Sequence, residues 1–334
     1  MRKLWMAGGA AAAMVLFLAW AVFAPYQGFF EENFVQVQRG TSSASIARML
    51  KESGVIRYSW VFLLERALHP SAKLQAGEYH FGKATSASEV FGRIARGDIY
   101  YFEFAVPEGN NMFQMANSIE ALGIMPGSEF LKAASDPSLI RDLAPKAETL
   151  EGYLFPSTYR LSHATTAAQL TKMMTDQFRK EWARLAPAQD GGRQADPLRI
   201  VTLASMIEKE TSVAEERPLI ASVFTNRLAK GMRLECDPTT IYAALLDNRY
   251  RGTIHRSDLK SSNPYNTYRN AGLPPGPIAN PGAAAIRAAL DPAETKYLYF
   301  VAKPEGESHQ FSATMTEHEK AVQTYRHAAR HKAL

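Results

Sequence analysis

Residues 198–211 read LRIVTLASMIEKET and show the strongest helical pattern in the chain. Apolar side chains recur at the spacing of a helix that has one buried face: Ile200, Leu203, Ala204 and Ile207. Glu208 lies about 100° beyond Ile207, so we expect it at the edge of that buried face. Glu210 is a further two positions on, about 200° around the helix, and cannot share a site with Glu208.

A carboxyl group at the edge of a core keeps its proton more readily than one in water, because desolvation disfavours its charged form. This is the property that a general acid needs near neutral pH. Thr211 and Ser212, three and four positions further on, could orient Glu208 by hydrogen bonding. From spacing alone, an ordinary surface glutamate on an amphipathic helix is the favoured interpretation.

The segments around this helix predict an α+β fold. Residues 185–197 form a polar loop before it, and a second helix should cover 218–230 and end at Gly231, with Ser212 and Glu215 as its capping box. Further on, strands are predicted at 297–302 and near Phe311, followed by a helix over 317–330. Helices and strands mix without βαβ regularity, which favours α+β over α/β.

Residues 34–82 predict a strand, two helices and a second strand. This pattern resembles a LysM-like module, a type of domain common in proteins that bind GlcNAc polymers. A binding module and a simple spacer both remain open for it. Part of the unit repeats 69 positions later, as a strand, a glycine turn and a helix closed by glycine. The matched pairs are Val37 and Val106, Gly40 and Gly109, Ala47 and Ala116, Leu50 and Ile119, Gly54 and Gly123, and Val55 and Ile124.

The N-terminus predicts a transmembrane helix over 4–24, because an apolar stretch of about 20 residues can cross a bilayer. Arg2 and Lys3 precede it and acidic residues follow, which places residues 1–3 in the cytoplasm and the body outside. A cleaved signal peptide is the alternative, but Pro25 follows the candidate cleavage site. Residues 25–33 are interpreted as a linker, 34–105 as a LysM-like subdomain and 106–334 as a catalytic domain.

Composition narrows the function further. The net charge is +5 with scattered basic residues, and no basic run interleaved with aromatics indicates a nucleic-acid partner. The single cysteine, Cys236, can form neither an internal disulfide nor a metal site, so we interpret it as buried and inert. No cofactor is expected.

The second unusual segment runs from Tyr265 to Gly282. Tyr265, Asn266, Thr267 and Tyr268 are followed by GLPPGPIANPG, a loop with four prolines and three glycines that fixes an irregular backbone. A rigid loop that presents tyrosine, asparagine and threonine suits sugar binding, although a well-packed connection has the same composition.

Several motifs together closely resemble the endolytic murein transglycosylase family, the YceG-like proteins. They are EGYLFPSTY (151–159), ASMIEKET (204–211), NRLAKGMRLECDPT (226–239), PYNTY (264–268), GLPPGPIANPG (272–282) and HQFSATMTEHEKAV (309–322). The likeness runs from about residue 34 to the C-terminus. Cys236 departs from it, because a small hydroxyl residue is expected before Asp-Pro-Thr.

The resemblance implies a membrane-anchored lytic transglycosylase with Glu208 as general acid and then base. Its substrate would be peptidoglycan glycan strands, cut between MurNAc and GlcNAc to leave 1,6-anhydro-MurNAc ends. The residues expected to position the substrate are Tyr265, Asn266, Thr267, Tyr268 and Asn280, with Asp237 and Glu151 as further candidates. The implied location is the cell inner membrane with the body in the periplasm. Membrane-bound peptidoglycan synthases are candidate partners, and termination or trimming of nascent strands is the implied role.

Two rival interpretations remain open: a LysM-like scaffold without activity, and a hydrolase of the lysozyme type that uses water. Two further motifs fail. Ser257 to Lys260 matches S-x-x-K, but no K-T-G motif accompanies it as a penicillin-binding enzyme requires. His318-Glu319 begins like a zinc-binding H-E-x-x-H but ends in valine, so one metal ligand is missing.

Overall fold

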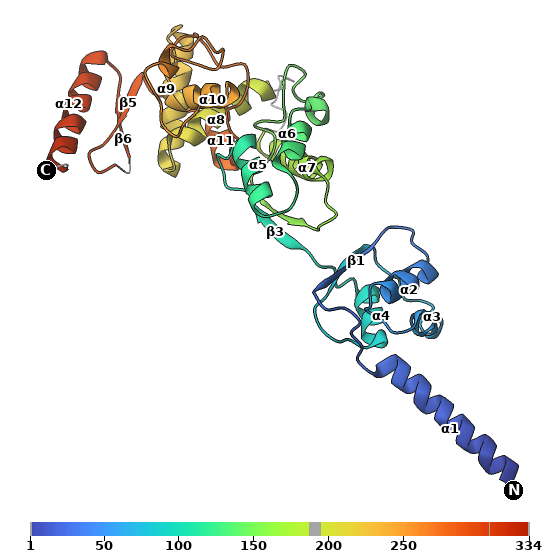
Figure 1. Ribbon diagram of the computed structural model, residues 1–334. Helices are drawn as coiled ribbons and strands as arrows, with labels where there is room; N and C mark the ends of the chain where they lie inside the picture. Colours follow the sequence, from blue (N-terminus) through green and yellow to red (C-terminus); the bar gives the residue numbers. More distant parts are fainter. Residues whose placement is uncertain (1, 187–194, 307, 333–334) are drawn as a thin grey trace. The chain divides into compact units, whose positions relative to one another are not determined.

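The computed structural model describes residues 2–186, 195–306 and 308–332 (Figure 1). The chain is mixed α+β and mostly helical, and the described residues contain three small two-stranded sheets. It divides into two compact units, one of residues 1–104 with 160–165, the other of 105–159 with 166–334. The loop predicted at 185–197 falls mainly on residues outside the described part.

The first unit contains the predicted strand–helix–helix–strand module. Strand β1 (Asn33–Val37), helices α2 (Ser43–Glu52) and α3 (Ser59–Leu68) and strand β2 (Gly77–Phe81) follow in order, and β1 pairs antiparallel with β2 from Asn33↔Phe81 to Val37↔Gly77. Helix α4 (Ala87–Arg96) packs against α3. The core is formed by the apolar faces of these elements, including Ile46, Leu50, Phe62, Tyr79, Phe81 and Ile94.

The N-terminal helix α1 (Arg2–Phe23) covers the predicted apolar segment, and its last turn joins this core through Ala21 and Val22. Among the helices of the described residues, none combines the length and apolar character needed to cross a membrane, so the predicted transmembrane helix is not confirmed. The segment after α1 is tied to the unit, because Tyr26 forms a β-bridge with Thr85 and the Gly28 N–H donates to the Gly54 carbonyl.

The sequence repeat is confirmed as a second strand–helix–helix–strand module. It consists of β3 (Phe102–Ala105), α5 (Met112–Ala121), α6 (Gly127–Ala134) and β4 (Thr158–Leu161), and β3 pairs with β4. Helix α5 begins and ends 69 positions after α2. The paired glycines share left-handed backbone angles: φ is 81° at Gly40 and 76° at Gly109. Only glycine adopts this conformation at little cost, which is why the sequence marks both turns.

The rest of the second unit is a cluster of helices: α7 (Ala167–Leu185), α8 (Pro197–Glu210), α9 (Arg217–Ala229), α10 (Asp237–Leu246) and α11 (Ala283–Leu290). Helix α8 packs against α9, α10 and α11. Because it has neighbours on several sides, every residue from Val201 to Ile207 is buried, a wider face than the predicted stripe. The predicted helix over 218–230 is confirmed as α9, but the Ser212–Glu215 capping box does not form.

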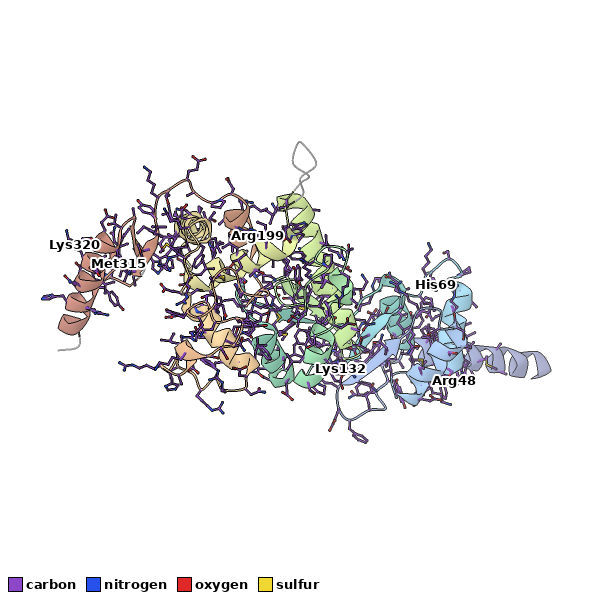
Figure 2. All side chains as sticks on the ribbon, turned by 90° about the horizontal axis from the view of Figure 1, so that it is seen from above. Arg48, His69, Lys132, Arg199, Met315 and Lys320 are labelled. Carbon is purple, nitrogen blue, oxygen red and sulfur yellow. The ribbon has the colours of Figure 1, made fainter. Side chains whose placement is uncertain are left out.

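The C-terminal strands and helix match their predictions. Strands β5 (Tyr299–Ala302) and β6 (His309–Ser312) form an antiparallel hairpin, and α12 (Met315–Lys332) packs against both. Met315 and Lys320 mark α12 in Figure 2, where Arg199 marks the first turn of α8. Arg227 of α9 fixes the chain before β5 by donating from Nε to the Leu298 carbonyl at 2.6 Å.

Candidate active site

Glu208 lies in the last turn of α8. The helix starts firmly, because the Asp196 carboxylate accepts hydrogen bonds from the N–H groups of Leu198 and Arg199, with Pro197 as the first helical residue. The Glu208 side chain is only 5% exposed. The sequence therefore placed it correctly at the edge of the buried face.

Two groups from other elements hold the Glu208 carboxylate. Arg217, the first residue of α9, donates from Nη2 to Oε1 at 3.3 Å, and its own side chain is 10% exposed. The backbone N–H of Gly282, which precedes α11, donates to Oε2 at 2.9 Å. The prediction that Thr211 and Ser212 orient Glu208 is wrong, because Thr211 turns the other way and donates to Glu216 at 3.2 Å.

A second carboxyl group, that of Glu108, lies beside Gly282 and was not predicted from the sequence. It belongs to the turn between β3 and α5 and is exposed. Its carboxylate lies directly against Gly282, where a methyl group would overlap it. Partial burial raises the pKa of Glu108, the charge of Glu208 raises it further, and Arg217 acts in the opposite direction. The sequence contained a signal for Glu108, because this residue immediately precedes Gly109, one of the repeated glycines.

The turn at Gly109 lies against the side chain of Glu208. A side chain at Gly109 would lie 3.4 Å from Cγ of Glu208, so the left-handed glycine lets the backbone approach the glutamate closely. Lys209 Nζ donates to the Gly109 carbonyl at 3.2 Å, and the Gly109 N–H donates to the Asn280 carbonyl at 2.9 Å. The corresponding turn at Gly40 is open. The turn of the second module thus contributes to this site.

Asn280 and Glu151, both predicted substrate residues, are fully buried. The Asn280 Oδ1 accepts hydrogen bonds from the N–H groups of Gly152 and Leu154 at 2.8 and 2.9 Å. Its Nδ2 donates to Glu151 at 2.6 Å. Glu151 also accepts from the Met112 N–H and from the Tyr242 hydroxyl. These donors favour the carboxylate, but complete burial outweighs them and raises the pKa of Glu151 to about 7.

Comparison with known proteins shows which family the chain belongs to. The sequence model of the YceG-like family matches residues 35–324. The chain belongs to the YceG-like family. It is 34% identical over 307 residues to a Bacillus subtilis protein named endolytic murein transglycosylase, covering 87% of this chain and 84% of that protein.

More distant relatives and a solved structure carry related descriptions. A Streptococcus pneumoniae protein with the same name is 26% identical over 316 residues, which cover 86% of this chain and 57% of that longer protein. The crystal structure of a YceG-like protein from Listeria monocytogenes matches with a TM-score of 0.56 and 32% identity, covering 87% of this chain and 99% of that one.

In this YceG-like chain, the predicted sugar-binding segment 265–268 divides into buried and accessible side chains. Asn266 and Thr267 are buried, and their polar groups bond within the protein: the Asn266 amide donates to the Ser261 carbonyl at 2.8 Å, and Thr267 Oγ1 accepts from the Cys236 N–H at 3.0 Å. Both therefore shape the loop. Tyr268 donates to the exposed Asp237 at 2.6 Å, and the Tyr265 ring lies 5.1 Å from that of Tyr242.

Glu210, the second glutamate of the ASMIEKET motif, has different neighbours from Glu208. Glu210 interacts with Cys236, and its pKa is raised mainly by burial. Cys236 is a free, buried cysteine, as predicted, and burial raises the pKa of its thiol well above the ordinary value. The prediction that Glu210 and Glu208 do not share a site is confirmed by these separate partners.

Proposed function

We propose that this YceG-like protein is an endolytic murein transglycosylase that cuts peptidoglycan glycan strands. One observation carries the proposal: the Glu208 side chain is only 5% exposed, and Arg217 and the Gly282 N–H fix the position of its carboxyl group. The name of the Bacillus relative, which aligns with most of the chain, supports the same activity.

In the proposed mechanism, Glu208 first protonates the oxygen that links MurNAc to GlcNAc, and the C1–O bond breaks to give an oxocarbenium-like sugar. The resulting carboxylate then takes the proton of the MurNAc C6 hydroxyl, whose oxygen closes on C1. The product is a 1,6-anhydro-MurNAc end. Because the nucleophile belongs to the substrate, no water needs to be positioned.

The test is mass spectrometry of purified peptidoglycan incubated with the full chain. The full chain is appropriate because Ala21 and Val22 of α1 belong to the core of the first unit. We expect new anhydro ends, one water lighter than hydrolysis products. Glu208→Gln should abolish them without unfolding the protein, because an amide cannot donate and recover the proton. Glu215→Gln, at an exposed position nearby, is the matched control and should leave the rate unchanged.

The other outcomes have distinct meanings. Reducing ends in place of anhydro ends would mean that water attacks and that the protein is a hydrolase. No new ends from a folded protein that still binds glycan would support the scaffold interpretation. Full activity of Glu208→Gln would remove Glu208 from the mechanism.

Substrate positioning is proposed for the accessible members of the predicted set. Tyr268 and Asp237 form a hydrogen-bonded pair close to the surface, and Tyr265 stands beside Tyr242. An aromatic ring and a carboxylate suit stacking on a sugar ring and bonding to its hydroxyls. Tyr268→Ala should therefore raise KM for glycan more than it lowers kcat.

The proposed location is the inner membrane, with the body in the periplasm and nascent strands from a membrane-bound synthase as substrate. The support lies in the sequence: Arg2 and Lys3 precede the apolar residues 4–24. Membrane fractionation with alkaline extraction tests the location. Recovery in the soluble fraction would contradict it.

A further inference from the structure

Glu108 and Glu208 reach Gly282 from two different elements. Glu208, at the end of α8, accepts the Gly282 N–H at 2.9 Å. Glu108, in the turn that follows β3, places its carboxylate where a methyl group on Gly282 would be, and the three atoms nearest to such a methyl group all belong to this carboxylate. The next residue, Gly109, lies against Cγ of Glu208. Two carboxyl groups are therefore neighbours at one glycine.

Two cationic side chains of the described residues, Arg217 and Lys209, lie near this pair. Arg217 donates to Glu208 from α9 and also acts electrostatically on Glu108. Lys209 of α8 directs its ammonium group to the Gly109 carbonyl at 3.2 Å, and Gly282, the residue before α11, contributes its N–H. Glu208 is thus held by a guanidinium and an N–H donor, both of which stabilise a carboxylate more than a carboxylic acid.

This arrangement is unfavourable for a general acid, unless a second negative charge offsets Arg217. Resting on the proposed function, we propose that Glu108 is a positioning residue for the catalytic proton: it shares one proton with Glu208 and keeps the pair able to protonate the glycosidic oxygen. Two adjacent carboxyl groups resist losing their last proton, because the second ionisation brings like charges together. Burial and the charge of Glu208 raise the pKa of Glu108 in agreement with this role.

The proton cycle is balanced. The pair starts with one proton and transfers it to the glycosidic oxygen as the C1–O bond breaks. Both carboxyl groups are then ionised beside Arg217. The pair recovers one proton from the C6 hydroxyl as its oxygen bonds to C1, which restores the starting state.

The test compares pH–rate profiles for release of anhydro ends by the wild type and Glu108→Gln. Glu108→Gln leaves a single carboxyl group beside Arg217, so we expect the alkaline limb of the profile to move to lower pH. We expect about tenfold lower activity at pH 7.5 and recovery to within about threefold of the wild type near pH 5. Glu215→Gln serves again as the control.

Gly282→Ala gives an independent variant that keeps both carboxyl groups. The backbone at Gly282 has φ −75°, which alanine adopts without strain. The added methyl should displace the Glu108 carboxylate while leaving the Gly282 N–H to Glu208. We therefore expect a shift of the alkaline limb in the same direction as for Glu108→Gln, and a smaller one.

Equal loss of activity at every pH in Glu108→Gln would assign Glu108 a structural role only, and an unchanged profile would remove it from the mechanism. Either result overturns the proposal while the proposed function stands, because the wild type still releases anhydro ends. Absence of anhydro ends from the wild type at every pH is the separate failure of the proposed function itself. Thermal unfolding of each variant shows whether it is folded.

Discussion

Asn280 and Glu151, 129 positions apart in the chain, are joined by a hydrogen bond of 2.6 Å between the asparagine amide and the glutamate carboxylate. The same amide group accepts from the backbone of Gly152 and Leu154. These bonds clamp the proline-rich loop to the start of the EGYLFPSTY segment. Gly282, whose N–H holds Glu208, follows Asn280 by two positions, so the clamp fixes one of the two groups that hold the proposed catalytic residue.

Replacing Asn280 by alanine should destabilise the second unit and lower activity together. The change removes the hydrogen bonds to Gly152 and Leu154 and leaves buried partners unsatisfied, which we expect to cost about 3 kcal/mol in the free energy of unfolding. Denaturant unfolding measures it. Asn270→Ala is the control, because its amide also donates to a carbonyl, at 2.9 Å, but is exposed. A loss no larger than that of the control would contradict the clamp.

Glu151 should make the free energy of unfolding depend on pH. Its pKa is about 7 in the folded protein and near 4.5 when unfolded, so the unfolded chain releases this proton first as pH rises. The contribution to stability is fully present below pH 4.5 and is lost as pH rises through 7. It amounts to about 3 kcal/mol in total. The difference between the wild type and Glu151→Gln, measured from pH 5 to 8, isolates this group, and a difference independent of pH would disprove it.

The sequence predicted the parts of the fold that depend on local patterns. The repeat was visible because Gly40 and Gly109 occupy the same left-handed turn, and the hairpin and final helix follow from apolar spacing. The sequence marked the turn that carries Glu108 but not its approach to Glu208, and it could not show that Gly282 reaches Glu208 from 74 positions further along the chain. Asn280 shows a second limit. An asparagine whose amide binds a sugar and one whose amide binds buried backbone look the same in a sequence.

Cys236 should be unreactive until the protein unfolds. Burial and the neighbouring Glu210 raise the pKa of its thiol, and only the thiolate reacts readily with disulfide reagents. At pH 8 we expect labelling of the native protein to be at least about a hundredfold slower than labelling in denaturant. Rapid labelling of the native protein would show that the region around the start of α10 opens, against its buried packing.

Gly152→Ala should destabilise the protein more than its backbone angle alone explains. Gly152 has φ 87°, and a methyl group there would overlap the Pro277 ring and lie 2.7 Å from Val201 of α8. Gly231, at φ 67°, has open space around it, so Gly231→Ala reports the backbone strain alone, about 1 kcal/mol. We expect Gly152→Ala to lower the free energy of unfolding by at least about 2 kcal/mol more, because the Pro277 ring and α8 cannot both move away from the added methyl group. Equal losses at the two glycines would mean that the loop moves away from α8 easily, in which case the clamp at Asn280 would not hold Gly282 against Glu208.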